Sequence, residues 1–173
     1  MAKTTQSPKE YGNESIKKLK GADRVRKRPA VIFGSDGLDG CEHSVFEIIS
    51  NSIDEAREGY GKKIVVTRFL DKSVEVQDFG RGIPVDYNNR EKCYNWELVF
   101  CDLYAGGKYD TNDGGSYEYS LGLNGLGLCS TQYSSEYMDA EIHTGGYKYL
   151  LHFEKGNPVG EMIKEEYTRR ILI

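Results

Sequence analysis

The sequence predicts an α/β fold of two layers, in which one mixed but mostly antiparallel sheet carries helices on one face. Two observations predict this class. A long amphipathic helix over residues 41–58 is followed by a β-hairpin, and a second β-hairpin follows two further helical segments. With 173 residues, the chain is long enough for one domain with a buried core. We expect that domain over residues 16–173, after an N-terminal arm over residues 1–15.

Composition argues against several classes of protein. The hydrophobic share of 38% and the charged share of 29% are typical of a globular domain. No apolar run approaches the roughly 20 residues of a membrane-spanning helix, and residues 1–10 lack the apolar segment of a signal peptide. We therefore expect no membrane contact and a cytoplasmic location. The net charge of −4 argues against a surface that coats nucleic acid.

A basic stretch lies near the start of the chain. Its members are Lys17, Lys18, Lys20, Arg24, Arg26, Lys27 and Arg28. Two interpretations stay open at this point. The stretch is either a patch that contacts phosphates or the solvated face of a short helix over residues 16–27, which ends before Pro29.

The other elements follow from local patterns. Apolar side chains recur every three to four residues in 41–58, after a turn-rich loop over 34–40. Alternating β-branched residues predict strands, and glycine pairs or an Asp-Lys pair predict the turns between them. The expected elements are a hairpin of 63–70 with 73–78, helices over 95–104 and 125–135, a hairpin of 139–143 with 147–153, and a final strand within 162–173. The connection over 105–122 is long, and such loops are usually functional or disordered.

Three clusters of residues carry chemistry, and the first lies on the long helix. Glu47, Asn51 and Asp54 are spaced four and three residues apart and point the same way, with Glu55 beside them. Carboxylates and an amide beside a core are costly unless they meet a cation or a ligand. Taken alone, the stripe is more typical of a helix that faces solvent.

The second cluster follows a strand. Asp78 ends the strand, and two glycines flank Arg81 in the loop behind it. A carboxylate beside backbone that glycine frees is suited to the exocyclic amine of a purine. Ile83 and Pro84 are the expected apolar wall for the base.

The third cluster is a glycine-rich run before a helix. Its members are Gly122, Leu123, Asn124, Gly125, Leu126 and Gly127. Glycines let backbone amides approach an anion, and the helix N-terminus adds a favourable dipole. Lys108, in the long loop, supplies a positive charge for the same phosphates. The run is neither a Walker A loop nor a Rossmann fingerprint, because the lysine and the preceding strand are absent.

Together, the three clusters resemble the motifs of the GHKL ATPases, whose domain has the Bergerat fold. Residues 47–55 are similar to the N box of that superfamily, the sequence DFGRGIP at 78–84 to its first glycine box, and GLNGLG at 122–127 to its second. Residues 15–29 and the sequence AGGKYD at 105–110 are similar to the branch of type II DNA topoisomerase B subunits, of gyrase and topoisomerase IV. The resemblance covers about residues 11–167.

The resemblance implies a role for each cluster. Glu47 would be the general base that activates water, Asn51 would ligate Mg²⁺, and Asp78 would bind the adenine amine. Asp54 and Glu55 would support the site, with Glu55 paired to Arg81. The remaining implied nucleotide contacts are Gly82, Ile83 and Pro84 at the base, Lys108 and residues 122–127 at the phosphates, and Tyr11 and Ile16 reaching from the arm into the partner's site of a dimer.

The resemblance also implies a larger machine. ATP would clamp two copies together for DNA strand passage, with an A-type subunit and DNA bound through parts that this chain lacks. We expect the domain to be C-terminally incomplete, without the transducer domain and its lysine, and weak or inactive as an ATPase alone. Two alternatives stay open: a truncated, non-catalytic GHKL module that acts through protein contacts, and a DNA-binding protein that uses the basic stretch.

Overall fold

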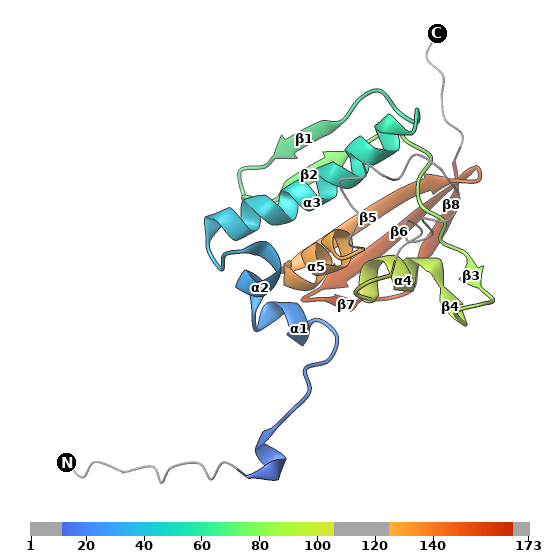
Figure 1. Ribbon diagram of the computed structural model, residues 1–173. Coiled ribbons are helices and arrows are strands. Elements are labelled where there is room, and N and C mark those ends of the chain that lie inside the picture. Colours follow the sequence, from blue (N-terminus) through green and yellow to red (C-terminus); the bar gives the residue numbers. More distant parts are fainter. Residues whose placement is uncertain (1–11, 106–124, 168–173) are drawn as a thin grey trace.

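A computed structural model describes residues 12–105 and 125–167 of the chain (Figure 1). Its helices are η1 (Asn13–Ser15), α1 (Asp23–Arg26), α2 (Pro29–Phe33), α3 (Leu38–Arg57), α4 (Asn95–Cys101) and α5 (Gly127–Ser134). Its strands are β1 (Val65–Arg68), β2 (Val74–Gln77), β3 (Tyr87–Asn88), β4 (Cys93–Tyr94), β5 (Tyr137–Thr144), β6 (Tyr147–Glu154), β7 (Asn157–Pro158) and β8 (Ile163–Glu166). In the part of the chain that is described, no helix has the length and apolar character needed to cross a membrane.

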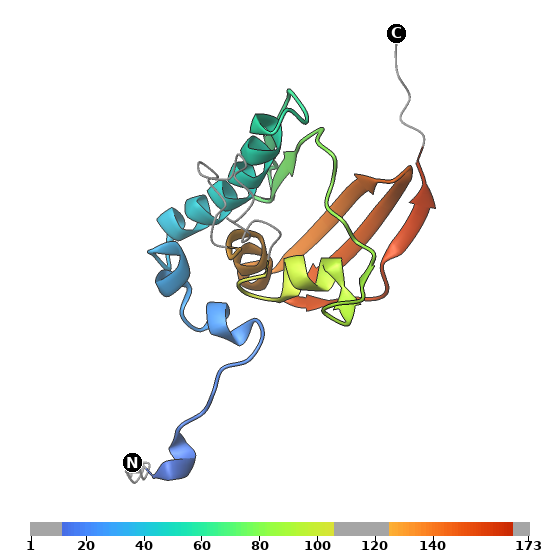
Figure 2. The same ribbon diagram turned by 45° about the vertical axis from the view of Figure 1, so that its right-hand side comes forward.

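Strand β6 is the centre of the main sheet. It pairs with β5 along all eight residues of each strand, and its other edge pairs with β8 and β7 in turn. Every described pairing is antiparallel, and α4 and α5 cover one face of this sheet (Figure 2). The predicted class, helices on one face of an antiparallel sheet, is confirmed.

The described strands form three sheets instead of the single expected one. Within residues 12–105 and 125–167, β1 and β2 pair only with each other, as do β3 and β4. The glycine turn that follows β2 carries the chain across to the end of β5, where a Cβ on Gly82 would lie 2.5 Å from the carbonyl oxygen of His143. β2 and β5 therefore approach each other through this turn without sharing a hydrogen-bonded ladder.

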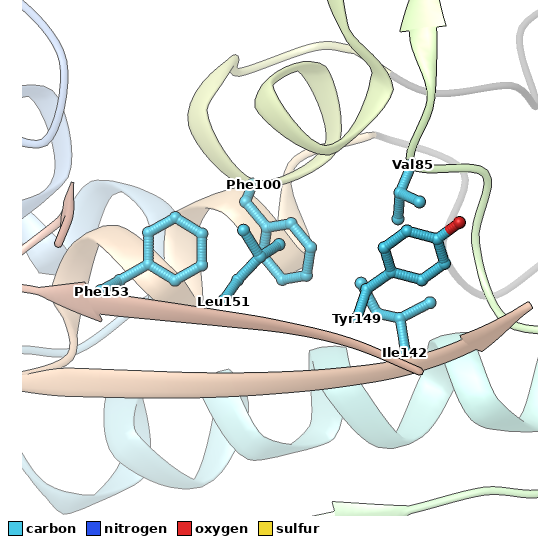
Figure 3. Packing of buried hydrophobic residues seen from close by; sticks show 6 residues of the cluster. All are labelled: Val85, Phe100, Ile142, Tyr149, Leu151 and Phe153. Carbon is cyan, nitrogen blue, oxygen red and sulfur yellow. The ribbon is translucent and has the colours of Figure 1, made fainter. Parts of the chain in front are cut away.

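The main core lies between β5, β6 and α4 (Figure 3). Its buried members are Val85, Phe100, Ile142, Tyr149, Leu151 and Phe153. Tyr149, Leu151 and Phe153 alternate along β6 and so share one face of the sheet. Phe153 stacks on Phe100 with ring centroids 5.3 Å apart, and Trp96 contacts it from α4 at 6.3 Å. Helix α4 is thus held to the sheet by aromatic packing.

A second cluster joins α1 and α2 to α5. Val25 and Phe33 pack against Cys129 and Tyr133, and the Tyr133 hydroxyl donates a hydrogen bond to the carbonyl of Cys101. Burial raises the pKa of the Cys129 thiol to about 12. Cys129 therefore stays protonated and acts as a small apolar side chain of this cluster.

The predicted helix over residues 16–27 is wrong for most of its length. Only Asp23–Arg26 is helical, because Gly21 has a φ of +49°, which breaks a right-handed helix before it. Pro29, predicted only to end a helix, also opens α2 from its first position, where its fixed φ suits a helix. Both hairpins and the helices of the central region are confirmed, whereas α2, β3, β4 and β7 had not been predicted.

Removal of the Phe153 ring tests the main core. Phe153 has no exposed surface, so Phe153→Ala leaves a cavity and should destabilise the fold by about 3–5 kcal/mol. Urea unfolding followed by circular dichroism measures this change. Phe46→Ala is the control, because Phe46 is 62% exposed on α3 and its loss should change stability by no more than about 0.5 kcal/mol. Equal losses in the two variants would contradict this description of the core.

His152 on β6 should make stability depend on pH. Its hydrogen bond to Asp139, with further help from Glu154, raises the pKa of the imidazole above its ordinary value of 6.5. The charged ring is the stabilised form, so the contribution is complete below pH 6.5 and is lost as the pH rises through the folded-state pKa. An NMR titration of the His152 ring should show a lower pKa in Asp139→Asn, and an unchanged value would refute the assignment.

Candidate functional site

Helix α3 carries the acidic stripe and sets the position of each member. Its 20 residues run without a break from Leu38 to Arg57. Asp54 is buried, with 5% of its surface exposed, whereas Glu47 and Asn51 are half-buried. Among the described residues, no hydrogen bond to the Asn51 side chain is present. The stripe therefore does not face solvent along its whole length, and no described side chain competes with a ligand for the amide of Asn51.

The first residue of α5 lies directly against Glu47. A Cβ added to Gly127 would lie 2.1 Å from Oε2 of Glu47 and 2.9 Å from its Cβ. Only glycine fits at this approach of two helices. The N-terminus of α5, where backbone N–H groups have no partner within the helix and the helix dipole is positive, is thereby placed beside the carboxylate.

His43 holds the other side of the Glu47 carboxylate. Its Nε2 lies 3.1 Å from Oε1 of Glu47, and its Nδ1 lies 3.1 Å from the carbonyl oxygen of Phe33. Both partners have oxygen acceptors, so a ring nitrogen that carries a hydrogen can donate to the oxygen that it faces. His43 was not predicted, although its position four residues before Glu47 on a predicted helix was the signal that could have found it.

Asp78 is oriented by two donors. The hydroxyl of Ser52, on α3, donates to Oδ2 at 2.8 Å, and the backbone N–H of Gly80 donates to Oδ1 at 3.0 Å. Beyond these two bonds, each carboxylate oxygen has a further lone pair that can accept from another donor. Ser52 is buried and was also missed, because the sequence does not reveal which helix face a strand end will meet.

The expected ion pair between Glu55 and Arg81 is present. Nε and Nη2 of Arg81 donate to the two carboxylate oxygens at 2.8 and 2.9 Å, and the backbone N–H of Arg81 donates to Oε1 at 2.8 Å. These hydrogen bonds raise the pKa of the guanidinium. The Tyr60 ring lies 3.7 Å from the guanidinium carbon. A Cβ on Gly80 would lie 2.4 Å from Cγ of Glu55, so the first glycine box is packed tightly against α3.

The other residues of the predicted base pocket, Gly82, Ile83 and Pro84, differ in their surroundings. Gly82 has a φ of +74°, a conformation that favours glycine, and turns the chain toward β5. Ile83 packs against the main core, whereas Pro84 is exposed. At the end of the second glycine box, Gly125 has a φ of +57°, and the carbonyl of Leu126 accepts the first helical hydrogen bond of α5 from the backbone N–H of Ser130.

Several predicted nucleotide contacts are not among the residues that the structure brings together. Tyr11, Lys108, Gly122, Leu123 and Asn124 lie outside the described residues. Ile16 is 76% exposed and directly follows η1, which Figure 1 places away from the body of the domain. The structure thus brings together the α3 stripe, Asp78, the first glycine box and the end of the second glycine box.

Proteins similar to this chain are B subunits of type II topoisomerases. The DNA gyrase B subunit of Thermotoga maritima is 45% identical over 149 residues, which cover 86% of this chain and 23% of that protein. The type 2 topoisomerase B subunit of Aquifex aeolicus is 41% identical over 155 residues, which cover 90% of this chain and 19% of that protein. The chain therefore spans between 19% and 23% of the length of these two relatives. No family model matches the chain.

A solved structure shares the fold. The topoisomerase IV ATP-binding domain of Francisella tularensis, in complex with a small-molecule inhibitor, aligns with a TM-score of 0.69 at 32% identity, over 87% of this chain and 38% of that one. Helices on an antiparallel sheet, with glycine boxes against one long helix, define a domain of the GHKL class. Within that class, the chain belongs to the family of type II topoisomerase B subunits, which includes the B subunit of DNA gyrase.

Proposed function

We propose that this chain binds ATP on the face of α3 where the sequence clusters meet. The observation that carries the proposal is the set of contacts along this one helix. Glu47 touches the N-terminus of α5, Ser52 holds Asp78, and Glu55 holds Arg81. An anion-binding helix end and an oriented carboxylate are therefore two ends of a single site, as a nucleotide requires.

Asp78 would recognise the base. A purine amine needs an acceptor, and the Asp78 carboxylate retains lone pairs beyond the bonds from Ser52 and Gly80. The Glu55–Arg81 pair and the tight packing of Gly80 would keep the loop 80–84 beside the base. Gly82, Ile83 and Pro84 are proposed to line the pocket there.

Asn51 and α5 would hold the phosphates and their metal. An amide oxygen is a hard ligand that Mg²⁺ accepts, and Mg²⁺ commonly takes few protein ligands together with substrate phosphates and water. The half-buried amide of Asn51, to which no described residue forms a hydrogen bond, fits that requirement. Within the described residues, no group of three or more His, Cys, Asp or Glu side chains is placed to hold a metal alone. Bound Mg²⁺ would offset the charge on the phosphates.

Glu47 would act as the general base of ATP hydrolysis. Its carboxylate lies beside the N-terminus of α5, where the phosphates are expected, and needs only one water between itself and the γ-phosphorus. The base would take a proton from that water as its oxygen bonds to phosphorus and ADP leaves. His43 would orient the carboxylate from its other side.

The wider function follows from the family. We propose that the chain is the ATPase part of a type II DNA topoisomerase, with an arm over residues 1–15 and the GHKL domain over residues 16–173. Nucleotide binding would bring two copies together, through Tyr11 and Ile16 of the arm, in a cytoplasmic enzyme that acts on DNA with an A-type subunit. The alternative is a nucleotide-binding module that does not hydrolyse ATP.

Loss of the Glu47 carboxylate should separate binding from turnover. Glu47→Gln should lower the rate of ATP hydrolysis by at least about a hundredfold, because it removes the proton acceptor, while ATP affinity changes little. A coupled phosphate-release assay and calorimetry measure the two quantities. Glu42→Gln is the matched control on an exposed position of the same helix. The turnover comparison is made in a full-length context, since we expect the chain alone to be weak or inactive as an ATPase. Turnover that persists there in Glu47→Gln contradicts the general-base role, and binding without turnover in the unaltered full-length protein favours the alternative.

Asp78→Asn should weaken ATP binding and alter base selectivity. The unaltered chain should prefer ATP to ITP, because hypoxanthine presents an oxygen where adenine has its amine. An asparagine can donate to that oxygen, so the preference should fall by roughly tenfold. Calorimetry with both nucleotides measures the ratio, with Asp86→Asn, exposed on the same loop, as control. An unchanged ratio would exclude Asp78 from base recognition.

A further inference from the structure

Arg26, the last residue of α1, makes an unusual set of contacts with the end of α5. Its Nη1 lies 3.2, 3.2 and 2.8 Å from the carbonyl oxygens of Tyr133, Ser134 and Ser135. Its Nη2 donates to Oε1 of Glu136 at 2.8 Å. Only 27% of the Arg26 side chain is exposed. Arg26 is thus neither a free phosphate contact nor part of a solvated face, the two interpretations that the basic stretch allowed.

These contacts supply hydrogen-bond donors to the carbonyl groups at the C-terminal end of α5. The last carbonyls of a helix have no partner within it, and the negative end of the helix dipole attracts a cation. A guanidinium presents several N–H donors in a rigid fork, so it reaches three carbonyls and a carboxylate together, which an ammonium group cannot do with the same geometry. Arg26, followed by Lys155, lowers the pKa of Glu136, as expected for a carboxylate held by cations.

The same junction is closed by packing. Val25, next to Arg26, has no exposed surface and lies in the cluster with Cys129 and Tyr133 of α5. A Cβ on Gly156 would lie 2.3 Å from Cβ of Ala22 and 3.2 Å from the Tyr133 ring. The end of α5 is therefore fixed between α1 and the turn that follows β6.

We infer that Arg26 is a positioning residue for the nucleotide site, which it reaches through α5. The inference rests on the proposed function. The eight residues of α5 form a rigid rod of about 12 Å, with Arg26 at one end and Gly127 against Glu47 at the other. A shift or fraying at the C-terminal end moves the N-terminal amides relative to Glu47. Triphosphate binding therefore depends on Arg26, whereas base recognition by Asp78, which contacts α3 and its own loop, does not.

Two ligands distinguish positioning from general stability. Mg²⁺ with AMPPNP reports on phosphates and base together, and adenosine reports on the base alone. In Arg26→Met the affinity for Mg²⁺–AMPPNP should fall by roughly tenfold, with that for adenosine within about twofold of the unaltered chain. Arg26→Lys should restore part of the loss. Lys27→Met is the control, because the Lys27 ammonium group forms its ion pair with exposed Asp23, at 2.7 Å, and not with the end of α5. Calorimetry and ligand-observed NMR, well below the unfolding temperature, give both affinities.

The affinities of the variants test the inference about Arg26 and the proposed function separately. Unchanged AMPPNP affinity in Arg26→Met, or equal losses for AMPPNP and adenosine, would overturn the inference. If Arg26→Met does not fold, Glu136→Gln tests the same contact, since Glu136 is 72% exposed and its loss should still weaken AMPPNP selectively. If the unaltered chain binds neither ligand, the proposed function itself fails. In that case, amide hydrogen exchange across residues 127–134 tests whether Arg26 holds α5 in place. Arg26→Met should accelerate the exchange, whereas Lys27→Met should not.

Discussion

The close approach of α3 and α5 is the constraint on which the rest of the site depends. A side chain at Gly127 would overlap the Glu47 carboxylate, so the two helices meet only because this position lacks a Cβ. The contact places the positive end of the α5 dipole beside the Glu47 carboxylate. Thr131 strengthens the same interface, because its hydroxyl donates to the Ser44 carbonyl at 3.0 Å. Without this approach, the acidic stripe of α3 would have no helix N-terminus beside it, and α3 would be an ordinary amphipathic helix.

The elements that local pattern determines were predicted from the sequence. Apolar spacing over residues 41–58 predicted α3, and the glycine pair at 145–146 predicted the turn between β5 and β6. The prediction of a helix over residues 16–27 was wrong, because the composition of this stretch carries no information on the φ of Gly21. Helix α2 is only five residues long, too short for a periodic pattern, and its stability comes from Phe33 packing against α5.

The candidate site shows the same division. Motif order predicted Glu47, Asp78 and the glycine boxes as site residues, and the expected Glu55–Arg81 pair is present. The residues that orient them were not predictable in this way. Ser52 reaches Asp78 from 26 positions away, and Arg26 reaches Ser135 from 109 positions away. Such pairs are set by the tertiary arrangement of helices and strands, which no local spacing in the sequence encodes.

Helix α3 also explains how residues supported by two separate sheets could contact one nucleotide in the proposed site. The β1–β2 hairpin carries Asp78, the main sheet supports α5, and the two sheets share no hydrogen-bonded ladder. In the proposed site, α3 would therefore set the spacing between the base end and the phosphate end, because the segment from Glu47 to Glu55 spans on the order of 12 Å of rigid helix. A nucleotide that contacts both ends links hairpin to sheet, and because it binds only the folded arrangement it must stabilise that arrangement. In the proposed site, the packing of α5 against α3 and the contacts that hold the far end of α5 would thus affect nucleotide affinity together with the groups that touch the ligand.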